Sequence, residues 1–278
     1  MKWNRIIAVM KKDLMEVKGN KSVWAPMIIV PALFVFVLPL SMLLIPPRFE
    51  SFQQSLMSSN ADLDFFLNNM PPSMLAPLEG LSDMQSMYVL MLGYILAPMF
   101  LIFPLMFSTI IASESFAGEY ERKTIEALLY TPASDSELFL GKVFTALLPS
   151  VAITWVSFFI YSLVLNIAGY PVFGRIWFPF ANWYPLIFWI TPALAVLGIA
   201  AAVLISARTR TFMGAYQLSA SLVILVLGIL GGQLSGVLYL TVETGLLIGL
   251  FFWIIAAIVS YIAIKSFNRS RLLTGIKL

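Results

Sequence analysis

Six stretches of this chain contain no Asp, Glu, Lys or Arg, and each is long enough to cross a bilayer. A spanning helix needs about 20 mostly apolar residues. Inside lipid the backbone must satisfy its own hydrogen bonds, which a helix does within one segment. The pattern therefore predicts an all-α membrane protein with six transmembrane helices. The stretches are 24–45, 84–113, 143–170, a fourth within 176–207 that begins near residue 183, a fifth within 211–242, and 245–264.

The composition excludes most soluble alternatives. Of the 278 residues, 60% are hydrophobic and 11% are charged, whereas soluble domains have about 25% charged residues. A soluble enzyme, a nucleic-acid binder and a disordered protein are therefore poor interpretations. The chain has no Cys and no His, which excludes disulfides, thiolate or imidazole metal sites and histidine-based acid–base catalysis.

The distribution of positive charge predicts the orientation. If the segments between the six stretches alternate in side, 15 of the 17 Lys and Arg residues fall on one side, and Arg48 and Arg175 on the other. Because cytoplasmic segments are enriched in Lys and Arg, we expect a multi-pass protein of the cell membrane with both termini in the cytoplasm. The segment 46–83 is then an outer loop. It is acidic, but it lacks a calcium-loop pattern, so a solvated loop is favoured over a cation site.

Residues 1–23 precede the six-helix domain of residues 24–278 and are expected to form an amphipathic helix. Its apolar residues recur at steps of three and four, which places them on one helix face. Such a helix can lie in the headgroup plane with its lysines near anionic lipid. Two interpretations stay open: a basic leader that only sets topology, or an interfacial helix that also touches a cytoplasmic partner. The proposed lipid-facing residues are Trp3, Ile6, Ile7, Met10 and Leu14.

The cytoplasmic segment 113–142 is expected to form a helix, a tight turn and a second helix. Pro132 ends the first helix, because the residue before a proline disfavours helical geometry. Ser134 and Glu137 fit a capping box for a helix that begins near Asp135. The segment is either an ordinary hairpin between two spans or a rigid elbow that transmits force from a cytoplasmic protein.

No source of energy is visible in the chain itself. It contains no GxxxxGK[ST] phosphate loop and no catalytic motif. The six stretches contain none of the ionisable residues by which ion-driven transporters bind the coupling ion, although backbone carbonyls at a broken helix remain an alternative. The chain is therefore not expected to be an enzyme, and the energy for uphill transport would come from a separate subunit.

The sequence EYERKTIEALLYTP at 119–132, followed by LGK at 140–142, resembles the signature of ABC-2 type permeases, the membrane subunits of ATP-binding-cassette exporters. Ile125 departs from the leucine that is common there. The residues that match are Glu121, Arg122, Thr124, Glu126, Leu128, Leu129, Pro132, Gly141 and Lys142.

The resemblance implies a six-helix half-transporter that pairs with a second copy or a paralogue and binds an ATPase subunit. ATP and Mg²⁺ would then bind to that partner, with no cofactor in this chain, and the segment between the second and third spans would be the coupling helix. A re-entrant helix within 231–245 is a further possibility. The residues implied in coupling are Glu119, Glu121, Arg122, Thr124, Glu126, Pro132, Ser134, Glu137 and Lys142.

Polar residues inside the spans are candidates for a translocation path, although helix packing is their commoner role. These candidates are Tyr88, Tyr94, Gln217 and Ser221. Four aromatic residues near the outer end of the fourth span are expected to form an interfacial belt, and these are Trp177, Trp183, Tyr184 and Trp189. The alternatives to an ABC exporter are a secondary transporter or channel that works without an ATPase, and a membrane scaffold.

Overall fold

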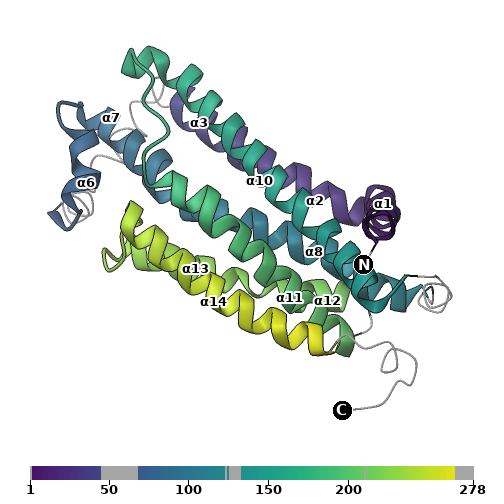
Figure 1. The fold of residues 1–278 in the computed structure, drawn as a ribbon. Helices are drawn as coiled ribbons and strands as arrows, with labels where there is room; N and C mark the ends of the chain where they lie inside the picture. The colour runs from purple at the N-terminus through teal and green to yellow at the C-terminus, as the bar shows by residue number, and fades with distance from the viewer. Residues whose placement is uncertain (1, 45–67, 123, 125–132, 210, 267–278) are drawn as a thin grey trace.

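A computed structural model describes residues 2–44, 68–122, 124, 133–209 and 211–266. Within this part of the chain every regular element is a helix, and six helical segments are long and apolar enough to cross a membrane (Figure 1). The prediction of an all-α fold with six spans is therefore confirmed. The segments are Lys21–Leu44, Asp83–Glu121, Asp135–Phe173, Pro185–Thr209, Phe212–Leu234 and Val242–Lys265.

Most spans are built from more than one helical element. The first comprises α2 (Lys21–Ala32), the π-helix η1 (Leu33–Val37) and α3 (Leu38–Leu44). The second comprises α7 (Asp83–Tyr88), the π-helix η4 (Val89–Ile95), the 3₁₀-helix η5 (Pro98–Leu101) and α8 (Ile102–Glu121). The third is α10 (Asp135–Phe173), the fourth is the π-helix η6 (Pro185–Ile190) with α11 (Thr191–Thr209), the fifth is α12 (Phe212–Ala220) with α13 (Val223–Leu234), and the sixth is α14 (Val242–Ser266).

Each π-helix ends shortly before a proline, namely Pro39, Pro98 or Pro192. Proline has no N–H to donate, and its ring clashes with the carbonyl four residues earlier. A locally wider turn accommodates this clash without ending the span.

The second and fourth spans form the centre of the bundle. In their most apolar windows 78% and 72% of the residues are buried, against 22–33% in the other four spans. Figure 1 shows α8 and α11 between α10 on one side and α14 on the other. Gly198 allows α11 to approach α8 closely, because a Cβ at this position would collide with Ser108 Oγ. Small residues promote such close helix contacts in membrane proteins.

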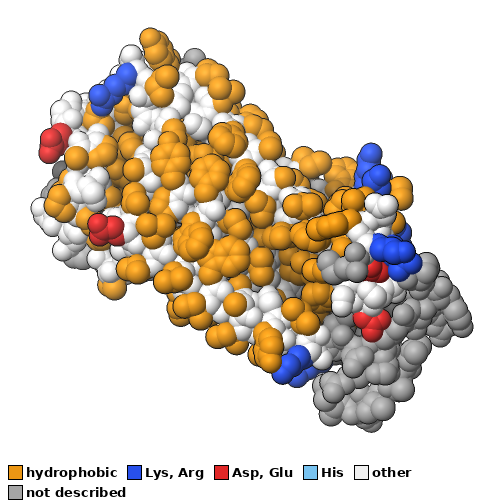
Figure 2. Space-filling view, viewed as in Figure 1, with side chains coloured by type: hydrophobic (Ala, Val, Ile, Leu, Met, Phe, Trp, Pro, Cys, Tyr) orange, Lys and Arg blue, Asp and Glu red, His pale blue; other side chains and the backbone are white. Residues whose placement is uncertain are grey.

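The lateral surface of the bundle is apolar, and charged side chains lie mainly at its two ends (Figure 2). Large exposed hydrophobic residues, such as Ile29, Ile167, Ile224 and Leu247, occur on several outer spans. Such a surface is suited to lipid rather than water. The chain is therefore a multi-pass membrane protein.

The helix α1 (Trp3–Gly19) lies across one end of the bundle, which we call the α1 end. Figure 1 views α1 nearly along its axis, whereas the spans run in the plane of the picture. The short helices α6 (Pro72–Leu75) and η3 (Ala76–Leu78) belong to the opposite end, which we call the α6 end. The described part of the predicted outer loop is thus partly helical.

The wide turn η4 exposes three backbone carbonyls that receive side chains from other spans. Leu96 N–H donates to Met91 O and Ala97 N–H donates to Tyr94 O, so neither bonds to the carbonyl four residues earlier. The three donors are Tyr161 Oη to Leu92 O at 2.8 Å, Trp183 Nε1 to Gly93 O at 2.7 Å, and Gln233 Nε2 to Tyr94 O at 2.8 Å. All three donor side chains are fully buried. We call the three carbonyls and their donors the carbonyl hub. Its hydrogen bonds connect η4 in the second span to α10, to the segment before η6 and to α13.

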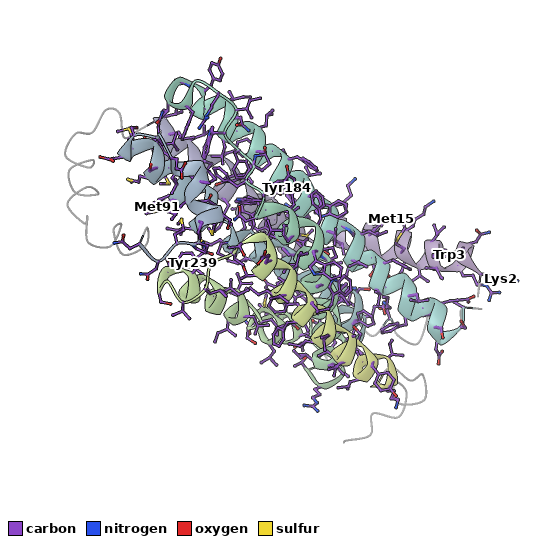
Figure 3. All side chains as sticks on the ribbon, turned by 60° about the vertical axis from the view of Figure 1, so that its left-hand side comes forward. Lys2, Trp3, Met15, Met91, Tyr184 and Tyr239 are labelled. Atoms are coloured by element: carbon purple, nitrogen blue, oxygen red, sulfur yellow. The ribbon has the colours of Figure 1, made fainter. Side chains whose placement is uncertain are left out.

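The predicted aromatic belt is wrong for two of its four residues. Trp183 is fully buried among Phe100, Phe158 and Phe178, and Trp177 is 8% exposed. An indole N–H that finds a carbonyl no longer needs the polar interface, and both tryptophans have one. Tyr184 and Trp189 are exposed, as expected for a belt (Figure 3 labels Tyr184).

Residues 231–245 contain no separate re-entrant helix. They comprise the end of α13, a short connection that includes Gly236 at a positive φ, and the start of α14. Gln233 at the end of α13 is held in the carbonyl hub instead.

Candidate functional site

The candidate site lies at the α1 end, where α1 crosses the end of α8 and the start of α10. Gly141 makes the crossing close, because a Cβ there would lie 2.8 Å from Val9 Cβ and 3.2 Å from Ile6 O. The glycine of the predicted Gly–Lys pair thus has a packing role, and the neighbouring Lys142 has an electrostatic one.

Lys142 joins three elements through buried polar contacts. Its Nζ lies 3.2 Å from Asp13 Oδ2 on α1 and 2.7 Å from Glu119 Oε2 on α8, and it donates to Ser115 O at 2.6 Å. Ser115 Oγ also donates to Asp13. The side chains of Lys142, Asp13 and Glu119 are 4%, 1% and 3% exposed. We call these three residues the buried triad.

Lys12 forms the partly exposed edge of this cluster. Its Nζ lies 2.6 Å from Glu119 Oε1, 3.3 Å from Asp13 Oδ1 and 3.0 Å from Glu16 Oε1. Burial lowers the pKa of Lys12, but Glu119, Asp13 and Glu16 outweigh this effect and raise its pKa above the usual value. Lys12 therefore stays charged and balances the second carboxylate of the buried triad.

Arg122 connects α8 and α1 beside the triad. Its guanidinium lies 2.6 Å from Glu114 Oε1 and 3.1 Å from Glu16 Oε2. The oxygen atoms of Asp13, Glu16 and Glu119 lie within 4.8 Å of one another, a spacing that could suit a metal ion. Here Lys12 and Lys142 already supply cations to these carboxylates, so the arrangement is that of an ion-pair network.

The predicted capping box at the start of α10 is confirmed. Glu137 N–H donates to Ser134 Oγ at 3.3 Å, and Ser134 N–H donates to Glu137 Oε2 at 3.0 Å. Glu137 also accepts from Lys2 N–H at 2.6 Å and lies 3.5 Å from the Arg5 guanidinium. The cap therefore fixes the first turn of α1 as well as the first turn of α10.

Ser134→Ala is expected to reduce the free energy of unfolding by about 1 kcal/mol, because α10 loses a side-chain cap. Denaturant unfolding of the purified protein in detergent measures the change. The control is Ser136→Ala, an exposed serine two residues away. Equal effects of the two substitutions would contradict a specific contribution from the cap.

The structure locates most of the predicted coupling residues. Glu119, Glu137 and Lys142 are buried in the contacts described above, whereas Glu121 is exposed and accepts from Phe212 N–H at the start of α12. Thr124 N–H donates to Glu119 O. Glu126 and Pro132 lie outside the described residues. Asp13, Lys12, Glu16 and Glu114 are not among the predicted site residues. A signal for Asp13 was present, because it lies seven residues after Ile6 and four before Val17, a spacing that places all three on one helix face.

The predicted apolar face of α1 is divided between two environments. Ile6 is buried with Asp13 and Val17, whereas Trp3, Ile7 and Met15 are exposed (Figure 3 labels Trp3 and Met15). Met10 and Leu14 are half-buried. The prediction that these residues face lipid is therefore wrong for Ile6, because the side of α1 that carries Ile6 packs against the bundle.

The four candidates for a translocation path do not converge within the chain. Tyr88 and Tyr94 are buried, and Tyr94 Oη donates to Met74 O. Gln217 on α12 and Ser221 directly after it are exposed. The tyrosines therefore pack inside the bundle, whereas Gln217 and Ser221 lie on its surface.

The comparisons with known proteins agree with the motif and the fold. A family model described as "ABC-2 family transporter protein" matches residues 7–270. No curated protein and no solved structure gives a significant match. The matched region includes α1 from Ile7 onward, all six spans and the charged cluster at the α1 end. The chain therefore belongs to the ABC-2 family of transporter proteins.

Proposed function

We propose that this chain is the permease subunit of an ABC exporter, in which a separate ATPase drives outward movement of the substrate. The observation that carries the proposal is the joining of α1, α8 and α10 by the charged cluster, next to the segment that matches the coupling motif. ATP and Mg²⁺ would bind to the ATPase subunit. The excess of Lys and Arg in alternate segments supports a cytoplasmic location of the α1 end.

The lengths of the second and third spans suit them to transmit force. Each has 39 residues, or about 58 Å of helix, whereas the hydrocarbon core is about 30 Å thick. Each span would therefore extend beyond the lipid, and the elbow would connect the two extensions. Closure of the ATPase would tilt this elbow, and the two spans would carry the tilt to the α6 end in an alternating-access cycle.

A second permease copy or a paralogue would complete the path. Gln217 and Ser221 are exposed on the fifth span, and polar groups that face lipid are unfavourable. A contact between the fifth spans of two subunits would remove these groups from lipid. The path would then run between subunits, in agreement with the burial of Tyr88 and Tyr94 inside one subunit.

Glu126→Lys is expected to abolish binding of the ATPase while the permease still inserts, because it reverses a charge in the segment that matches the coupling motif. The measurement is co-purification of the ATPase with tagged permease from membranes, followed by ATPase assays in vesicles. The permease alone should hydrolyse no ATP, since it contains no phosphate loop.

The matched control is Glu243→Lys, which reverses a charge in the first turn of α14. Unchanged co-purification with Glu126→Lys would overturn the assignment of the elbow. Transport by vesicles that contain only this chain would favour a secondary transporter or channel.

A further inference from the structure

The buried triad holds two carboxylates and one ammonium group at the place where three helices meet. Its members come from α1, α8 and α10, and more than 100 residues separate Asp13 from each of the other two. Replacement of a buried ion pair by apolar residues of similar volume often leaves the free energy of unfolding unchanged or raises it. Removal of one partner alone is strongly destabilising. An ion pair does, however, fix one geometry, because its atoms must meet at specific distances.

We propose that the buried triad locks α1 to both arms of the elbow, so that α1, the end of α8 and the start of α10 move as one body. Asp13 and Lys142 are then positioning residues for coupling. This inference rests on the proposed function for the origin of the movement. The lock itself is a property of the permease alone.

Two further contacts support one body rather than a loose docking of α1. The first turn of α1 is bound to Glu137 at the start of α10, and Glu16 near its end is bound to Arg122 at the end of α8. Gly141 brings the middle of α1 into direct contact with α10. The helix is therefore held at both ends and in the middle, and the buried triad is the part of this attachment that excludes water.

The charges of the cluster allow the lock to be removed without leaving an unbalanced buried charge. Asp13→Asn together with Lys142→Met removes one negative and one positive charge. Glu119 keeps its contact with Lys12 at 2.6 Å. The double variant should therefore be more stable than either single variant. A change in the position of α1 in this variant would then result from loss of the lock and not from an unpaired buried charge.

The experiment measures the distance between α1 and α10 with two spin labels. The chain has no Cys, so Met15→Cys and Ser136→Cys provide the two labelled positions, and both native side chains are exposed. Since the first turn of α1 touches Glu137, the labels should be about 20 Å apart, the length of 13 helical residues. The protein is studied in lipid nanodiscs, alone and with its ATPase trapped by ATP and vanadate.

With the lock intact, we expect one narrow distance distribution that is the same with and without trapped nucleotide. In Asp13→Asn/Lys142→Met the distribution should broaden and shift to longer distances, even in the permease alone. Lys18→Met, an exposed lysine on the same helix, is the control and should leave the distribution unchanged. A distribution in the double variant equal to that with intact charges would overturn the lock, as would a nucleotide-dependent distance when all charges are intact.

The design separates the lock from the proposed function. If no ATPase binds, the proposed function fails, while the broadening in the isolated double variant still supports the lock. If an ATPase binds and its stimulated activity is the same with and without the double substitution, Asp13 and Lys142 are not positioning residues for coupling.

Discussion

Lys142→Met is expected to lower the free energy of unfolding by about 3–5 kcal/mol, the largest effect predicted for a charged residue of this protein. The substitution leaves Asp13 and Glu119 buried, and only Lys12 remains to balance them. It also leaves Ser115 O without the ammonium donor at 2.6 Å. Unfolding by denaturing detergent, followed by circular dichroism, measures the change.

The control for this prediction is Lys18→Met, which removes an exposed lysine and should alter stability by less than about 0.5 kcal/mol. Lys142→Arg is an informative third variant, because it keeps the charge but must fit a planar guanidinium into a site shaped for an ammonium. A stability of Lys142→Met that is indistinguishable from that of Lys18→Met would show that Lys142 does not balance the buried carboxylates.

Trp183→Ala is expected to destabilise the protein by about 3–5 kcal/mol, because it removes a fully buried aromatic side chain from the core. It also leaves Gly93 O at η4 without its donor. Trp183→Phe helps to separate the two effects, since it removes the N–H but keeps an aromatic ring and so leaves a much smaller cavity than alanine. The loss of that bond alone should account for about 1–3 kcal/mol.

Tyr184→Ala is the matched control, because Tyr184 is adjacent in sequence and 51% exposed. It should change stability far less than Trp183→Ala in the same unfolding assay. Similar effects of the two substitutions would contradict the larger contribution expected from the buried Trp183 side chain.

The spans and the capped start of α10 could be predicted because their signals are local. Each span is a run of uncharged residues, and Ser134 and Glu137 lie three residues apart within one helix turn. The ends of the second and third spans are predicted less accurately, because both spans are longer in the structure than their uncharged stretches. Charged residues suggest the limit of a span in the sequence. However, α8 includes Glu114 and Glu119 and α10 includes Lys142, because these charges are paired with opposite charges in the bundle.

The prolines in the spans are visible in the sequence, but their structural consequence is not. The sequence places Pro98 after a run of apolar residues, and a proline removes one backbone donor. Which side chains then bind the released carbonyls depends on Tyr161, Trp183 and Gln233, which reach η4 from three other parts of the chain. Nothing in their local sequence distinguishes them from ordinary polar residues near a membrane interface.

The amino-acid sequence alone predicts a helical protein that crosses a membrane six times and resembles the ABC-2 permeases, because a hydropathic run and a short motif are both formed by residues close together in the chain. The partners of Lys142 and the burial of Asp13 and Trp183 depend instead on how the helices pack. These contacts join residues that are far apart in the chain. Whether a polar side chain can be buried depends on a donor or counter-charge from another helix, and helix packing brings the two together.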